Sequence, residues 1–158
     1  MKIESPKYSI SSALNNITER QIALLDQENT DGLGWDYYCN GRITQPTVLN
    51  NRISGLIKEL GEVFQVEITA HENEISSKCS CGIRDGVCNH VVALLYSWVN
   101  DRADFINIGT LIGRLQHKDK SELIELIERI FANDPTNARF ITEMENELDE
   151  WKNDETDL

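Results

Sequence analysis

Three cysteines and one histidine within residues 79–90 have the residue types and the spacing of a metal site. Each of two ligand pairs has one intervening residue, and six residues separate the pairs, which are Cys79 with Cys81 and Cys88 with His90. Zinc prefers thiolate and imidazole ligands to hard oxygen ligands, and a structural zinc ion takes four ligands at tetrahedral corners. The pattern therefore predicts one structural zinc ion with no position left for a catalytic water.

Two other kinds of chemistry fit part of this cluster. Cys79 and Cys81 alone would make a redox pair, but one residue separates them, whereas thioredoxin-type motifs have two. An iron–sulfur site would ask for a fourth cysteine, which Cys39 would have to supply from forty residues upstream. We expect Cys39 to be a small buried apolar residue instead, and His71 and His117 to lie at the surface.

The residues before the cluster have the pattern of a helix followed by a small antiparallel sheet. Apolar residues at helical spacing predict a helix from Ile10 to Gln27. Asn40-Gly41 is a strong signal for a two-residue hairpin turn, with Pro46 indicating an edge strand or an early strand end. The predicted strands are Trp35–Cys39, Arg42–Val48, Arg52–Lys58, Phe64–Thr69 and Glu74–Lys78. The first of them carries the aromatic residues Trp35, Tyr37 and Tyr38, which we expect to lie in the core.

After the cluster the apolar period becomes helical. Residues 89–99 predict a helix with Asn89 as its cap, so that zinc would tie the last strand to this helix. A linker of mixed character follows, from Arg102 to Gly113. Asp119 and Glu122 have capping-box spacing, and Asp134-Pro135 indicates a second helix start, so the C-terminal third predicts two short helices.

The predicted fold is α+β, with a small antiparallel sheet, an N-terminal helix, a zinc-tethered helix and a C-terminal helical appendage. We assign residues 1–100 to the zinc domain with its upstream helix and meander. Residues 101–152 form the helical appendage, and residues 153–158 form an acidic tail.

The charge and the apolar runs limit the function. The formal charge is -12, of which the last sixteen residues carry -7. Because phosphate contacts come from Lys and Arg, this charge disfavours nucleic acid as a partner. No apolar run could span a bilayer and the N-terminus lacks the apolar core of a signal peptide, so we expect a cytoplasmic protein without membrane contact. No nucleophile and base are arranged for catalysis, so we expect neither an enzyme nor a small-molecule substrate.

The order Cys-x-Cys, short spacer, Cys-x-His and apolar helix resembles the SWIM-type zinc finger. Upstream and downstream segments resemble the strands before this finger and the helical appendage of some stand-alone prokaryotic members: Gly41-Arg42-Ile43, Ile53-Ser54-Gly55, Phe64–Ile68, Ser121–Ile127 and Asp134-Pro135. The resemblance implies Cys79, Cys81, Cys88 and His90 as the zinc ligands.

The resemblance also implies a function. SWIM fingers are non-catalytic adaptor modules that bind protein or DNA, and stand-alone members are similar to partners of RecA-family recombinase paralogues in DNA recombination and repair. Where relatives often have a basic residue between the last two ligands, this chain has Asn89, which favours a protein partner. The alternative is a nucleic-acid-binding module that uses a local patch of Arg42, Arg52, Lys58, Lys78 and Arg84.

Overall fold

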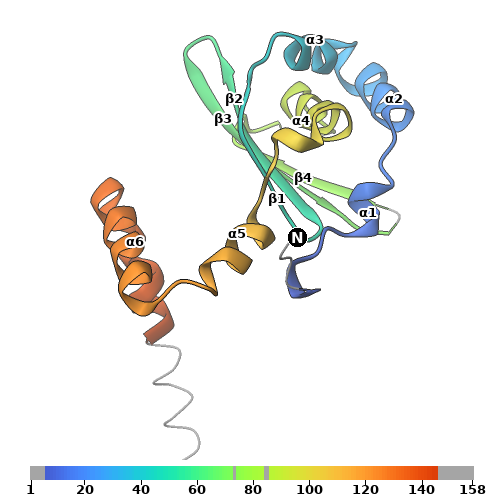
Figure 1. The fold of residues 1–158 in the computed structure, drawn as a ribbon. Helices are drawn as coiled ribbons and strands as arrows, with labels where there is room; N and C mark the ends of the chain where they lie inside the picture. The colour runs from blue at the N-terminus through green and yellow to red at the C-terminus, as the bar shows by residue number, and fades with distance from the viewer. Residues whose placement is uncertain (1–5, 73, 84–85, 146–158) are drawn as a thin grey trace, which may run out of the picture. The chain divides into compact units, whose positions relative to one another are not determined.

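A computed structural model describes residues 6–72, 74–83 and 86–145 (Figure 1). The chain divides into two compact units, Met1–Arg114 and Leu115–Leu158. The assignment of residues 1–100 and 101–152 to independent domains stays a prediction, and the acidic tail over residues 153–158 lies outside the described residues. Within the described part of the chain, every helix is too short or too polar to cross a membrane.

The first unit is built on a five-stranded sheet that confirms the predicted α+β class. Its order is β4-β3-β2-β1-β5, antiparallel throughout except that β5 runs parallel to β1. Leu60 and Gly61 both have positive φ angles and join β2 to β3 as a two-residue hairpin turn. The strands are β1 (Ile43–Leu49), β2 (Arg52–Glu59), β3 (Glu62–Ala70), β4 (Ile75–Cys79) and β5 (Ile106–Asn107).

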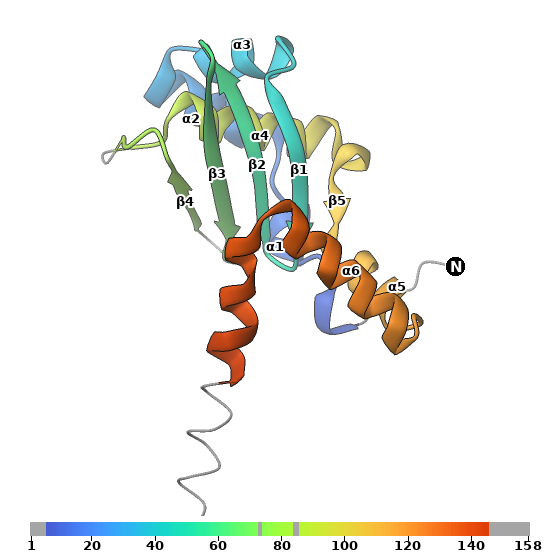
Figure 2. The same ribbon diagram turned by 90° about the vertical axis from the view of Figure 1, so that its left-hand side faces the viewer.

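Helices cover one face of this sheet, and the central one is α4 (Asn89–Asn100), as predicted. Figures 1 and 2 show α4 next to the sheet, with α2 (Glu19–Thr30) and α3 (Leu33–Cys39) packed around it. Leu94 and Leu95 are neighbours in sequence, yet both are fully buried because α4 is covered on opposite sides. Burial of each such side chain contributes about 1.5–3 kcal/mol.

Short elements frame this core at both ends of the unit. The Trp98 ring nitrogen donates a hydrogen bond of 2.9 Å to the Leu14 carbonyl, which ties α4 to the N-terminal segment. The segment predicted as a linker contains β5 and most of α5 (Ile108–Leu115). The remaining short elements are η1 (Pro6–Tyr8), α1 (Ser12–Asn15) and η2 (Arg102–Asp104).

The prediction of one helix from Ile10 to Gln27 is wrong, because the chain breaks between α1 and α2. Thr18 has an extended backbone and caps α2, since its side chain accepts from the Gln21 N–H while the Gln21 side chain accepts from the Thr18 N–H. This capping box satisfies two N–H groups that a continuous helix would have bonded internally. The apolar residues keep their helical spacing across the break, so the sequence pattern did not reveal it.

The prediction of a strand over Trp35–Cys39 is also wrong, because these residues lie in α3. The cause is Asp26, which is 2% exposed and accepts hydrogen bonds from the N–H groups of Gly34 and Trp35, each at 3.0 Å. A buried carboxylate at a helix N-terminus satisfies amides that lack partners inside the helix. Burial, followed by the charge of Asp26, raises the pKa of Tyr96 on α4 to about 12. Asp26 therefore links α2, α3 and α4.

The second unit contains the predicted capped helix. It is α6 (Lys120–Asn133), in which Asp119 and Glu122 form the expected capping box. Asp134 caps η3 (Pro135–Ala138), and residues 139–145 are helical. Large apolar side chains are at least one-third exposed here, including Ile124, Ile127, Ile130, Phe140, Ile141 and Met144.

Gly34→Ala should lower the free energy of unfolding, although alanine usually stabilises a helix by about 1 kcal/mol relative to glycine. A Cβ atom at Gly34 would lie 2.3 Å from Val92 Cγ1 and 2.8 Å from Asp26 Oδ1. Overpacking of this kind costs about 1–3 kcal/mol. Urea denaturation measures the effect. Cys39→Ala, at an exposed position of the same helix, is the control and should change stability by less than about 0.5 kcal/mol. Equal or higher stability of Gly34→Ala would contradict the close approach of α3 to α4.

Candidate metal centre

The structure brings all four predicted ligands together. One potential ligand atom from each of Cys79, Cys81, Cys88 and His90 lies within 4.8 Å of the others. The first pair comes from the end of β4 and the second from the start of α4, so the cluster joins the outer strand of the sheet to the central helix. Such a group could hold one metal ion.

The first pair is positioned by the end of the β3–β4 ladder. The Ser80 N–H donates to the Gln65 carbonyl at 3.0 Å, and the Gln65 N–H donates to Ser80 Oγ at 2.9 Å. A turn then begins, in which the Gly82 N–H lies 3.4 Å from the Cys79 carbonyl. This turn brings Cys81 beside Cys79 in the cluster.

The second pair is positioned by the start of α4. Cys88 has an extended backbone and is the N-cap, and its carbonyl accepts the first helical hydrogen bond from Val92. Asn89, predicted as the cap, is instead the first helical residue. Cys88 and His90 are 5% and 4% exposed, whereas Cys79 and Cys81 are half-buried. The centre therefore has a buried side formed by the helix and a more open side formed by the turn.

The His90 ring is oriented by a carboxylate that the sequence pattern did not reveal. Its Nδ1 atom lies 3.6 Å from Cys79 Sγ, and its Nε2 atom lies 2.8 Å from Glu59 Oε2 at the end of β2. Because a carboxylate only accepts, Nε2 is the donor of this hydrogen bond, which leaves Nδ1 as the nitrogen that can bind a metal. A carboxylate behind a metal-binding histidine fixes its tautomer and makes it a stronger ligand.

Glu59 and the His90 ring have further neighbours. The Tyr37 hydroxyl on α3 donates a hydrogen bond to Glu59 Oε1, and the Arg42 guanidinium lies 4.4 Å from the Tyr37 ring centroid. Phe64 on β3 stacks on the imidazole with ring centroids 4.5 Å apart, while Tyr37 meets it edge-on at 5.6 Å. These contacts fix the orientation of the His90 ring before a metal binds. Metal binding would therefore cost less conformational entropy.

Sequence spacing could not have identified these supporting residues. Glu59 precedes His90 by 31 residues and belongs to a different element. The need for a partner at the second imidazole nitrogen is general, but many carboxylates in this acidic chain could have met it. The Leu60-Gly61 turn, which sets where β2 ends, is the feature that selects Glu59.

The thiols are coupled to one another. The Cys79 thiol donates toward Cys88 Sγ, which is the main reason that the pKa of Cys88 is lowered and that of Cys79 is raised. Burial raises the pKa of both groups, whereas the nearby N–H of Val91 helps to lower that of Cys88. A bound cation would bring all four ligands to their deprotonated forms.

One sulfur–nitrogen distance in the cluster fits a tetrahedral ion. Usual zinc–sulfur and zinc–nitrogen distances place a thiolate sulfur and an imidazole nitrogen about 3.6 Å apart at two corners of a tetrahedron. The distance between Cys79 Sγ and His90 Nδ1 is 3.6 Å. Both the geometry and the ligand types therefore suit a borderline-soft divalent cation.

The remaining candidate residues lie elsewhere. Cys39 is exposed on α3, so its prediction as a buried residue is wrong, and it is not one of the clustered ligand residues. His71 and His117 are exposed, as predicted.

Four of the five residues of the proposed basic patch lie in the described chain, and two of them contact other side chains. Arg42 lies on the Tyr37 ring, and Arg52 lies 3.6 Å from Glu67 in an ion pair. Arg52 and Lys58 stand at opposite ends of β2, about 20 Å apart at the usual strand rise. Arg84 lies outside the described residues.

Comparison of the chain with protein-family models, with curated proteins and with solved structures gave no match. The chemistry of the centre therefore rests on its own geometry.

Cys88→Ser should strongly weaken metal binding, because two thiolates and one imidazole leave one tetrahedral corner without a protein ligand. Cys39→Ser is the matched control and should keep one metal ion per chain, since Cys39 lies outside the cluster. Elemental analysis of desalted protein measures both. Loss of the metal in Cys39→Ser would refute the assigned ligand set.

Glu59→Gln and Tyr37→Phe should weaken metal binding while leaving the four ligands in place. We expect the dissociation constant to rise by roughly 10-fold to 100-fold for Glu59→Gln, the usual effect of losing a partner behind a ligand, and less for Tyr37→Phe. Competition with a chromophoric chelator measures affinity, and imidazole nitrogen chemical shifts report the His90 tautomer. Glu62→Gln, which is exposed across the same hairpin turn, is the control. Equal affinities of Glu59→Gln and Glu62→Gln would show that Glu59 does not support His90.

Proposed function

We propose that this chain is a zinc-binding, SWIM-type adaptor module that acts without catalysis by binding a protein partner. The observation that carries the proposal is the four-residue cluster that joins β4 to α4. Four protein ligands leave no open position for water or substrate, which is the arrangement of structural rather than catalytic zinc. The ion would hold the strand and helix together, and its binding energy would add to folding energy.

Zinc is the proposed ion because of the ligand set. Three thiolates and one imidazole suit zinc in a tetrahedral site, and the sulfur–nitrogen distance matches its usual geometry. The Glu59 hydrogen bond to His90 supports a neutral imidazole ligand with its free lone pair on Nδ1.

Charge and surface composition favour a protein partner over nucleic acid. The chain carries a net charge of -12, and Arg42 and Arg52 already interact with Tyr37 and Glu67. Apolar side chains of α6 and the following helical residues are exposed at helical spacing, which is typical of surfaces that bind other proteins. The resemblance to stand-alone SWIM proteins suggests a cytoplasmic recombination or repair complex, with a RecA-family recombinase paralogue as the candidate partner.

Purification of the tagged chain from its own cells tests this function. We expect the native complex to contain a stoichiometric protein partner and one zinc ion per chain, and to survive nuclease treatment and high salt. Cys39→Ser should recover the same partner, and Cys88→Ser should not. Isolation of the chain alone would refute the adaptor function. Retention of DNA that falls steeply with salt would favour the nucleic-acid alternative instead.

A further inference from the structure

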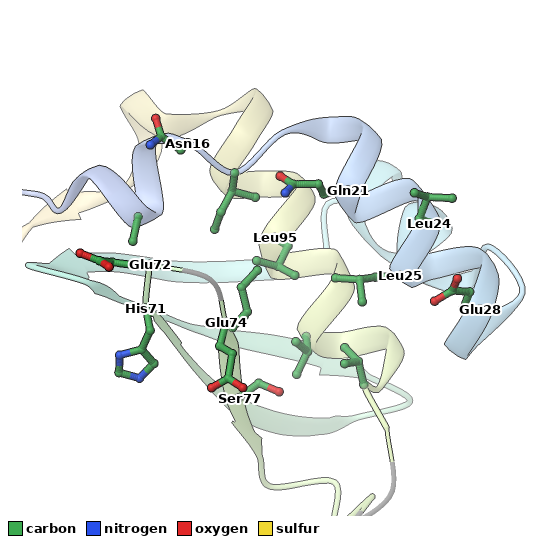
Figure 3. Close-up of a pocket in the computed structure, with 15 residues that line it drawn as sticks. Asn16, Gln21, Leu24, Leu25, Glu28, His71, Glu72, Glu74, Ser77 and Leu95 are labelled. Carbon is green, nitrogen blue, oxygen red and sulfur yellow. The ribbon is translucent and has the colours of Figure 1, made fainter.

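A groove of about 570 Å³ lies between α2 and β4, on the helix-covered side of the sheet (Figure 3). Its walls come from α2 and β4, while residues of α4 contribute to its base. The apolar side chains that line it include Ile17, Leu24, Leu25, Ile75, Val91 and Leu95. Leu24 is 56% exposed and Ile75 is 39% exposed, so part of this apolar surface is in contact with water.

One wall of the groove is an unpaired strand edge. β4 is the outer strand and, among the described residues, pairs only with β3. The His71 N–H donates to the Glu74 carbonyl at 2.7 Å, and the Ser80 N–H donates to the Gln65 carbonyl at 3.0 Å, which identifies two hydrogen-bonded pairs of the antiparallel ladder. Such pairs alternate with non-hydrogen-bonded ones. The backbone N–H and C=O groups of Ile75 and Ser77 therefore point away from β3.

The free backbone groups and the apolar surface belong to the same residues. Ile75 and Ser77 lie opposite Ala70 and Ile68, which are buried under the helices, so their side chains are on the helix-covered face. Both residues also line the groove. A strand added along β4 would thus bond to the backbone of Ile75 and Ser77 and place every second side chain against α2.

The rim of the groove is acidic. Glu28 of α2 and Glu72 and Glu74 beside β4 line it, and all three are exposed. Among the described residues that line the groove, none is Lys or Arg. Apolar side chains would fit the base of the groove, and basic side chains would fit its rim.

We propose that this groove binds an extended peptide segment of a partner protein, which adds to β4 as a sixth strand and carries apolar residues on its α2-facing side together with Lys or Arg residues that meet the acidic rim. This inference rests on the adaptor function and specifies its contact surface. Strand addition to a sheet edge obtains affinity from main-chain hydrogen bonds and specificity from alternate side chains. An open edge beside an apolar groove offers both.

Charge argues against the two other occupants that the chain itself could provide. Residues 146–158 contain six carboxylates and one lysine, so this segment would be repelled by Glu28, Glu72 and Glu74. A second copy that paired through β4 would bring two acidic rims together. A basic segment of another protein meets no such repulsion.

Selection from a displayed library of random short peptides against the zinc-loaded full chain tests the inference. We expect enriched peptides to combine apolar residues at every second position with Lys or Arg residues, and the best synthetic peptide to bind with a dissociation constant below about 100 μM. Exchange of its Lys and Arg residues for Glu should abolish binding. Enrichment of acidic peptides, or of none, would overturn the proposal.

Paired variants of the chain locate the binding surface. Ser77→Pro removes the outward N–H and Ser77→Ala keeps it, and proline is tolerated on strand edges. Leu24→Lys alters the groove, whereas Leu60→Lys makes the same exchange at an exposed turn. We expect Ser77→Pro and Leu24→Lys to weaken peptide binding at least about tenfold, and Ser77→Ala and Leu60→Lys to change it by less than about twofold. Equal binding within either pair overturns the proposal.

Two further measurements keep the test decisive. If Ser77→Pro loses its metal and fails to fold, N-methylation of alternate peptide amides probes strand pairing without changing the protein. Unchanged binding of peptides methylated in either register would overturn the proposal.

A dimer in sedimentation that Leu24→Lys disrupts would instead identify a second copy as the occupant. If the native partner is recovered equally by Leu24→Lys and Leu60→Lys, the groove assignment fails while the adaptor function stands. Recovery of no partner refutes the adaptor function itself.

Discussion

The meeting of the end of β4 with the start of α4, at four potential metal ligands, is the constraint on which the rest of this unit depends. α4 is the central element of the core, and its side chains are buried from Val91 to Trp98. A helix covered on all sides cannot be located by an amphipathic stripe alone. The cluster gives α4 a defined start, because Cys88 caps it and His90 lies in its first turn.

That constraint extends beyond the ligands through hydrogen bonds and ring contacts. Glu59 holds His90, Tyr37 donates to Glu59, and Arg42 covers the Tyr37 ring. The chain of contacts connects β2, α3 and the start of β1 to the metal centre, so these parts of the fold would respond to metal binding together. The short β4 strand serves two surfaces, since its end supplies Cys79 while the outward groups of Ile75 and Ser77 border the acidic groove.

Much of the sheet and the whole ligand set followed from local patterns. Local sequence patterns predicted β2, β3 and β4, and the Cys-x-Cys and Cys-x-His pairs predicted the cluster. Two predictions failed where a distant or competing polar contact decided the structure. The Thr18–Gln21 capping box split the first helix, and the buried carboxylate of Asp26 started a helix at residues that resemble a strand.

The sequence by itself determined which side chains can bind a metal, because ligand type and spacing are local properties of one short segment. It also determined the periodicity of the sheet and of the helices that follow. Only the tertiary structure decided that Glu59 orients His90, that Cys39 is exposed, and that an open strand edge lies beside an apolar groove with an acidic rim. These features depend on residues that are far apart in the chain, and their proximity is set by strand register and helix packing.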